Sequence, residues 1–322
     1  MTELRERLEA RQVFIYFAAI CTAAVCAAAL PAAGRLEAAI NPALAFMLFV
    51  TFLQVPMVEL GRAFTRMRFL AALLCTNFVA IPLAVAGLIQ FLPEEPLIRL
   101  GVLFVLLTPC IDYVVTFSHL GRSDAKLLLA ATPALLVLQM LLLPAYLRLF
   151  IGDAAASFVQ WGPFAEAFFW LIVVPLGLAA LVQAWAGRST AGTRTSALLG
   201  ILPVPATAVV LFVVAAAMLP QLGAARSTML LVIPIYLAFA LIAPLVGWMI
   251  AQAFRLEAPA GRAVAFSAAT RNSLVVLPLA MTVPGAIPLL PAIIVAQTMV
   301  ELVSSLIYIR VMPRLGSGSG AD

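Results

Sequence analysis

Ten apolar segments, separated by short polar stretches, make up almost the whole chain of 322 residues. Each is long enough to cross about 30 Å of hydrocarbon as a helix that rises about 1.5 Å per residue. Because the chain is 65% hydrophobic and only 10% charged, it cannot cover these segments with polar surface of its own. The sequence therefore predicts an all-α polytopic membrane protein. The predicted spans are approximately residues 13–33, 40–59, 69–92, 98–119, 125–150, 163–186, 197–219, 228–253, 261–283 and 286–309.

The basic residues predict how these spans are oriented. If the spans alternate, fourteen of the 19 Lys and Arg residues face one side and four face the other, namely Arg35, Arg99, Arg148 and Arg226. Since positive residues accumulate in cytoplasmic loops, both termini are predicted to be cytoplasmic, in an inner (plasma) membrane. The asymmetry also accounts for the net charge of +5, so nucleic acid is not predicted as a partner. The sequence does not predict an oligomeric state.

The fourth span contains residues that a continuous apolar helix does not tolerate. Residues 107–118 place Pro109, Cys110 and Asp112 in the middle of the span. Because Pro109 has no N–H and its ring clashes with the preceding turn, the helix is predicted to open near the bilayer centre and to free backbone carbonyls. An ionisable residue at that depth costs about 2.5 to 3.5 kcal/mol on insertion scales, so Asp112 is a functional candidate that needs a cationic partner.

Two further charges are predicted at the same depth. Arg271 lies in the ninth span, where Asn272 and Ser273 follow it, and it is the predicted partner of Asp112. Glu301 lies in the last span. Three unpaired charges would together cost about 8 to 10 kcal/mol, comparable with the stability of an ordinary domain. We therefore expect them to be paired or to lie in a polar cavity.

The positions of the interrupted spans predict an internal repeat. The fourth and ninth spans are equivalent in a chain of five plus five helices. Because five is odd, two tandem five-helix units insert with opposite orientation, and their broken helices cross at the midplane to form the site. The predicted organisation is a cytoplasmic N-terminus (1–12), a first five-helix repeat (13–152), a connecting loop (153–162), a second five-helix repeat (163–309) and a cytoplasmic tail (310–322).

These residues resemble those of the bile acid/sodium symporter superfamily, and within it the arsenical-resistance permeases that export arsenite. The resemblance covers nearly the whole chain in span count and order, although the specific residues are few. Thr76-Asn77-Phe78 with Pro82 is similar to the polar-aromatic-proline pattern of the third span, Thr108-Pro109-Cys110 to the cysteine motif of the fourth, and Arg271-Asn272 to the arginine-asparagine motif of the ninth, while Glu301 stands where the family keeps a glutamate.

The resemblance implies a fold and a site. Spans three to five and eight to ten would form a core that moves against a panel of spans one, two, six and seven. Cys110 would be the thiol that faces the metalloid, and Glu301 a coupling carboxylate. The other candidate substrate-binding residues are Asn77, Thr108, Asn272 and Ser273.

Two features depart from this pattern. Ile111 and Asp112 follow the cysteine where arsenite carriers have small and hydroxyl residues, and Ser273 replaces a second asparagine in the ninth span. In the sodium-coupled bile acid branch, the ninth span resembles an acid followed by a glutamine-asparagine pair. Here Ser267 and Arg271 stand at what look like the acid and glutamine positions. A fixed cation where sodium would sit argues against sodium coupling.

The chemistry of the substrate agrees with the resemblance. As(III) is a soft centre that favours thiolate, so Cys110 is predicted to contact it as substrate. Near neutral pH it is mostly an uncharged hydroxide, so the membrane potential alone does not drive its export and a coupled ion is needed. Either Asp112 or Glu301 could carry a proton as the site changes sides. We therefore predict a secondary active transporter that exports arsenite or antimonite by proton antiport, without a cofactor.

Other interpretations of these residues stay open. Arg271 could clamp the carboxylate of a small organic anion, which would make the chain an ion-coupled symporter of a bile acid-like or pantoate-like substrate. Cys110 could be a small packing residue, Asp112 and Arg271 a structural ion pair, and Glu301 a hydrogen-bond partner of a neighbouring helix. An enzyme is not predicted, because the chain has one histidine and neither G-x-S-x-G nor H-E-x-x-H. A channel would need a polar stripe along whole helices.

Overall fold

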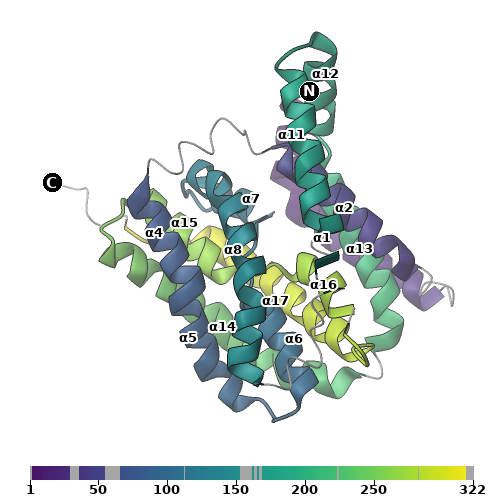
Figure 1. Cartoon of the computed structure of the whole chain (residues 1–322), viewed down its shortest axis with the longest axis vertical. Helices are drawn as coiled ribbons and strands as arrows, with labels where there is room; N and C mark the ends of the chain where they lie inside the picture. Colours follow the sequence, from purple (N-terminus) through teal and green to yellow (C-terminus); the bar gives the residue numbers. More distant parts are fainter. Residues whose placement is uncertain are drawn as a thin grey trace. The chain divides into compact units, whose positions relative to one another are not determined.

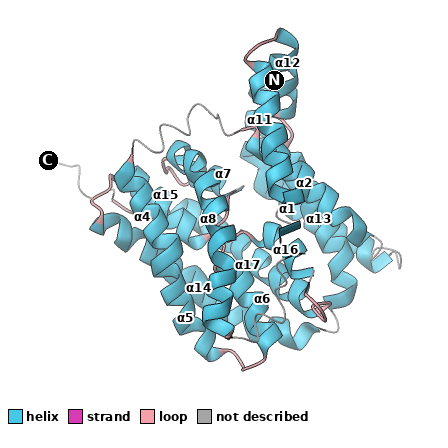
Figure 2. Ribbon diagram, viewed as in Figure 1, coloured by secondary structure: helices cyan, strands magenta, loops and turns pink. Residues whose placement is uncertain are grey.

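The structure is a computed structural model of the whole chain. It describes residues 2–29, 36–54, 66–111, 113–152, 162, 165–166, 169–222, 225–281 and 283–316. In this part of the chain every regular element is a helix, as Figure 2 shows. The prediction of an all-α protein is therefore confirmed.

The chain divides into two compact units, each built from two separate stretches of sequence. Unit 1 contains Met1–Met57 and Trp161–Arg226, and unit 2 contains Val58–Gln160 and Ser227–Asp322. Unit 1 therefore holds predicted spans one, two, six and seven, and unit 2 holds spans three to five and eight to ten. This is the grouping that the family resemblance implies. Because each predicted repeat contributes helices to both units, the inverted-repeat relation itself stays a prediction.

Unit 1 is held together by small side chains at helix contacts. Ala23 of α1 packs with Ala215 and Ala216 of α13, and all three are buried. Such residues let two apolar helices approach closely, which is the usual basis of helix packing in membranes. The helices of unit 1 are α1 (Thr2–Ala29), α2 (Glu37–Phe52), α11 (Val174–Ala186), α12 (Thr190–Leu199) and α13 (Pro203–Leu222), and the π-helical turn η4 (Phe169–Val173) precedes α11.

Unit 2 contains two pairs of short helices separated by breaks. They are α6 with α7, and α15 with α16. In this unit α4 lies beside α15 and α6 beside α17, although they are far apart in the sequence (Figure 1). The helices are α4 (Met67–Cys75), the π-helical turn η2 (Thr76–Ala80), α5 (Ile81–Leu88), the 3-10 turn η3 (Ile89–Phe91), α6 (Pro96–Leu106), α7 (Tyr113–Leu120), α8 (Ala125–Ile151), α14 (Arg226–Ala253), α15 (Ala258–Ala269), α16 (Ser273–Met281), α17 (Leu289–Val311) and the 3-10 turn η6 (Met312–Arg314).

Six helices of the described residues are long and apolar enough to cross a membrane, or seven if the bent pair α12–α13 is one span. This supports an integral membrane protein. The number is below the ten predicted spans, because the fourth and ninth spans are each divided at a break and α2 has only 16 residues. The ten-helix count therefore stays a prediction.

Candidate functional site

The break in the fourth span is built by Thr108 and Pro109. The helix α6 ends at Leu106, and the N–H of Thr108 turns to the carbonyl of Val105, at 3.2 Å. This leaves the Phe104 carbonyl without its helical donor, and the Thr108 hydroxyl replaces that donor at 2.8 Å. Thr108, a predicted substrate ligand, is fully buried and uses its hydroxyl to end the helix.

The break in the ninth span also has a threonine at its start, and the N–H of Thr270 keeps its helical bond to the carbonyl of Phe266 at 3.1 Å. The helix α15 ends at Ala269, and Thr270 adopts an extended conformation with φ −111° and ψ 136°. Its hydroxyl donates to the carbonyl of Phe266 at 2.8 Å. The Thr108 hydroxyl therefore replaces a lost helical donor, whereas the Thr270 hydroxyl is a second donor to a carbonyl that keeps its first.

The two breaks contact each other through their main chains. Pro109 and Arg271 form an antiparallel bridge. The N–H of Cys110 donates to the carbonyl of Thr270 at 3.1 Å, and the N–H of Asn272 donates to that of Thr108 at 2.8 Å. The prediction that the interrupted fourth and ninth spans meet is confirmed. The exchange is reciprocal, since each threonine carbonyl accepts from the residue two positions after the other threonine.

The guanidinium of Arg271 lies inside a group of oxygen atoms from both broken helices. Arg271 is the largest fully buried side chain of the described residues, with 0% exposure. Two of its acceptors are carbonyls at the C-terminal end of α15 and one is the last carbonyl of α6. A buried cation is favourable there, because carbonyls at a helix C-terminus carry partial negative charge. The donated bonds run from Nη2 to Ser267 O (2.6 Å), Ala268 O (2.6 Å) and Asn77 Oδ1 (3.0 Å), and from Nη1 to Leu106 O (3.3 Å).

Asn77, another predicted substrate ligand, is one of these partners. It lies in the π-helical turn η2 and is fully buried. Its amide nitrogen donates to Ser267 Oγ at 3.0 Å and to Leu73 O at 3.1 Å, while its oxygen accepts from Arg271. Both ends of the side chain are thus engaged within the protein. Asn77 ties the third span to the crossing and holds the guanidinium in place.

Glu301 is buried next to the Arg271 main chain, with 2% exposure. Its Oε1 accepts from the hydroxyl of Tyr113 at 2.7 Å. Its Oε2 accepts from the main-chain N–H of Arg271 at 2.7 Å and from Nε2 of Gln297 at 2.5 Å. The Ser273 hydroxyl donates to Oε1 of Gln297, which places this predicted ligand in the same network. The hydrogen bonds of Glu301 within the described residues therefore reach the backbone of Arg271 and not its guanidinium.

Sequence reasoning missed Tyr113 and Gln297. Gln297 lies one turn before Glu301 on the same helix, and this i, i+4 spacing was the available signal. Tyr113 is the first residue of α7, directly after the break. Nothing in the sequence singles it out, because its contact with Glu301 joins residues 188 positions apart.

Cys110 and Asn272 are the remaining predicted ligands at the crossing. Cys110 is 0% exposed, whereas Cys21 is exposed and Cys26 and Cys75 are half-buried. Asn272 is 1% exposed, and neither atom of its amide has a hydrogen-bond partner among the described residues. A buried amide in this state costs about 1 to 3 kcal/mol. Asp112 lies outside the described residues, so its pairing with Arg271 stays a prediction.

Two broken helices that meet at a buried polar centre, in a chain with several membrane-spanning helices, define a secondary membrane transporter. Residues 41–225 match the Sodium Bile acid symporter family. The chain belongs to this family, whose members are ion-coupled transporters and not enzymes. The match contains Asn77, Thr108 and Cys110 and ends before Arg271 and Glu301. No curated protein matches the chain in a sequence comparison.

Proposed function

We propose that this transporter exports a trivalent metalloid, arsenite or antimonite, in exchange for protons, and that the metalloid contacts Cys110. The observation that carries the proposal is the place of this thiol. It is fully buried, and its main chain is bonded to Thr270 across the crossing of the two broken helices. A soft As(III) centre favours a sulfur ligand, so a thiol at the crossing fits this substrate better than an alkali ion or a sugar.

Asn272 supports a substrate that carries hydroxyl groups. Its main-chain N–H donates to the carbonyl of Thr108. Asn272 directly follows one residue of the bridge, Arg271, and Cys110 directly follows the other, Pro109. Its amide leaves one acceptor and two donor hydrogens without partners in the described part of the chain. The hydroxyls of an uncharged metalloid hydroxide can both donate and accept, and so can satisfy this amide.

Glu301 supports coupling to protons. All three of its partners are donors, and this arrangement suits the ionised carboxylate. When Glu301 binds a proton at Oε1, this oxygen becomes a donor, and the Tyr113 hydroxyl has to turn and accept. The amide of Gln297 and the N–H of Arg271 can keep their bonds to Oε2. Protonation thus changes one contact, between α17 and the first residue of α7.

Arg271 argues against the alternative of an organic-anion symporter. A carboxylate clamp needs two parallel N–H donors that face the ligand. Nη2 donates to three protein oxygens and Nη1 to one, and the side chain is fully buried. Nε has no partner among the described residues, but Nη2, the nitrogen that would complete a fork with it, is already occupied. The same cation occupies the oxygen-rich space where an alkali ion would bind, so sodium coupling is not favoured either.

The test is arsenite uptake into everted vesicles, with a pH gradient or a sodium gradient imposed separately. An acidic lumen should drive arsenite into the lumen, and a sodium gradient at constant pH should not. Cys110→Ser should abolish this uptake and the resistance of cells to arsenite at unchanged expression. Cys75→Ser is the matched control, because Cys75 lies in the same unit at the end of α4, and should retain both. Sodium-dependent transport, or equal effects of both substitutions, would contradict the proposal.

A further inference from the structure

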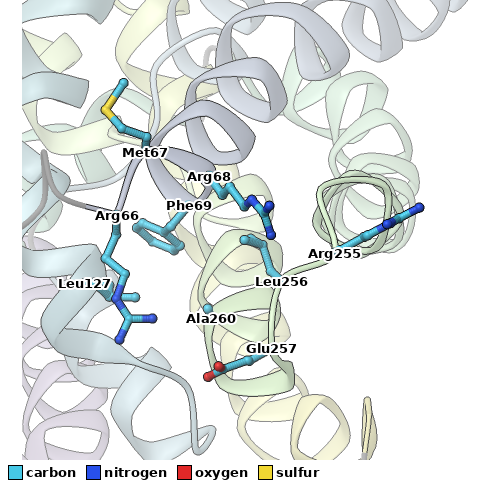
Figure 3. Close-up of a pocket in the computed structure, with 9 residues that line it drawn as sticks. All are labelled: Arg66, Met67, Arg68, Phe69, Leu127, Arg255, Leu256, Glu257 and Ala260. Atoms are coloured by element: carbon cyan, nitrogen blue, oxygen red, sulfur yellow. The ribbon is translucent and has the colours of Figure 1, made fainter.

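We propose that unit 2 carries a second binding site, separate from the crossing, for the phosphate headgroup of an anionic membrane phospholipid. The site is a cavity of about 370 Å³ at the end of the unit where α4, α8 and α15 begin and α14 ends. Figure 3 shows how its side chains lie. The residues that matter for the argument are Arg66, Arg68, Arg255, Glu257, Phe69 and Leu127.

The cavity holds more positive than negative charge. Arg66 and Arg68 project on either side of the buried Phe69, whereas Arg255, on the segment between α14 and α15, points away from the other labelled side chains and adds charge at the rim (Figure 3). None of these three guanidinium groups has a hydrogen bond or an ion pair with a described residue. Among the described residues of the lining, Glu257 is the one carboxylate. A concave surface with a net charge of this sign attracts anions.

Two helix N-termini add to this field. The helix α4 begins at Met67 and α15 begins at Ala258, both beside the cavity. Neither start is capped by a side-chain hydrogen bond. The first N–H groups of a helix and the positive end of its dipole favour a phosphate. Arginine adds bidentate bonds to phosphate oxygens.

The place of the cavity indicates a lipid and not a soluble anion. Three candidate membrane spans end there: Met67–Phe91 and Ala125–Ile151 begin at the cavity, and Arg226–Ala253 ends beside Arg255. The ends of such spans lie at the depth of the headgroups. Met67, in the lining, is 63% exposed and offers an apolar surface for an acyl chain. Basic pockets between helices at this depth bind anionic headgroups.

The experiment measures lipid binding to the purified full-length protein by native mass spectrometry. The probes are dihexanoyl phosphatidylglycerol and dihexanoyl phosphatidylcholine, which differ in headgroup charge and share their chains. The protein should retain phosphatidylglycerol in preference. Arg66→Gln and Arg68→Gln should each lower its affinity about fivefold, and the double variant about 25-fold. Lys126→Gln is the matched control, because Lys126 is an exposed cation in the first turn of α8 that does not line the cavity.

Each result decides the matter, provided that unfolding midpoints without lipid confirm that the variants are folded. Equal retention of the two lipids would overturn the proposal. A loss from Lys126→Gln as large as that from Arg68→Gln would do the same, because it would indicate attraction by the whole charged face. If inorganic phosphate at millimolar concentration displaces phosphatidylglycerol completely and binds with the same affinity as this lipid, the site binds free phosphate and the lipid assignment is wrong. The test does not measure arsenite uptake, so its result is independent of the proposed transport function.

Discussion

Glu301→Gln separates proton coupling from the rest of the proposed mechanism. The carboxylate accepts hydrogen bonds from Tyr113, Gln297 and the main-chain N–H of Arg271. Glutamine has nearly the same shape, but one of its two terminal atoms is a donor. Its oxygen must therefore face Arg271 and Gln297, which both donate to Oε2. Its NH2 group then faces Tyr113, whose hydroxyl can turn to accept.

The structure predicts that this variant folds. All three contacts persist in that orientation, although they lose the contribution of the ionised group. Side-chain hydrogen bonds between membrane helices contribute about 0.6 kcal/mol on average and about 1.7 kcal/mol at most. Weakening three of them should lower the free energy of unfolding by roughly 1 to 2 kcal/mol. Glu301→Leu would instead leave three buried donors unpaired, at about 1 to 3 kcal/mol each, which approaches the stability of a whole domain.

The assay compares two reactions of the same everted vesicles. Uptake driven by an acidic lumen should fall to the background of vesicles without the protein, because residue 301 no longer carries a proton. Exchange of labelled for unlabelled arsenite without a pH gradient should continue, because it needs no net proton transfer. If the gradient drives uptake by Glu301→Gln as well as by the unaltered protein, Glu301 is not the coupling group. If a folded Glu301→Gln variant loses the exchange reaction as well, Glu301 belongs to substrate binding and the division of roles proposed here is wrong.

Three further predictions test the surrounding structure. Tyr113→Phe keeps the edge-to-face contact with Phe117, at 5.9 Å between ring centroids, but removes the hydroxyl that donates to Glu301. Gradient-driven uptake should therefore fall about tenfold while arsenite exchange persists. An unchanged uptake rate would exclude Tyr113 from coupling. Gly247→Ala would place a methyl group 2.7 Å from Cβ of Ala268 and should lower the free energy of unfolding by about 1 to 3 kcal/mol, as measured by thermal unfolding. Gly87→Ala is the control and should have no such effect, because nothing lies within 4 Å of the added methyl group. Equal unfolding midpoints of the two variants would refute the close packing of α14 on α15. If Asp112 and Arg271 pair, the double variant Asp112→Asn/Arg271→Gln should lose less folded protein than the two single variants lose together, because a single change leaves one buried charge without its partner. Additive losses would mean that the two residues do not meet.

The breaks and their meeting could be predicted because they leave strong local signals. Pro109 cannot continue a helix, and Arg271 is too costly to leave in hydrocarbon without partners. Their equivalent positions among the ten predicted spans then indicated that the two breaks meet, and the bridge between these residues confirms that they do. The division into two units followed from the family resemblance in the same way.

The partners of the buried charges could not be predicted, because most of them are main-chain groups. The carbonyls of Leu106, Ser267 and Ala268 become available to Arg271 where α6 and α15 end, and any residue supplies a carbonyl. For the same reason the sequence gives no sign that Glu301 accepts from the backbone of Arg271. The π-helical turn that presents Asn77 was not predicted either, although Pro82, two residues after it, cannot donate to the carbonyl of Phe78, which accepts from the Tyr146 hydroxyl instead.

These partners limit which ion can be coupled under the proposed mechanism. A coupling ion has to leave the site on one side of the membrane and return on the other. The cation at the crossing is part of Arg271, and it is bonded to main-chain oxygens of two broken helices. Since this charge cannot dissociate from the chain, the exchanged ion must bind elsewhere, at a group that can be charged or neutral. Among the described residues of the crossing, Glu301 is the carboxylate that meets this requirement, and its partners face it with donors, since the amide oxygen of Gln297 accepts from Ser273 instead. A proton needs only one of the two carboxylate oxygens and the rotation of one hydroxyl, which is why we expect proton exchange rather than sodium symport.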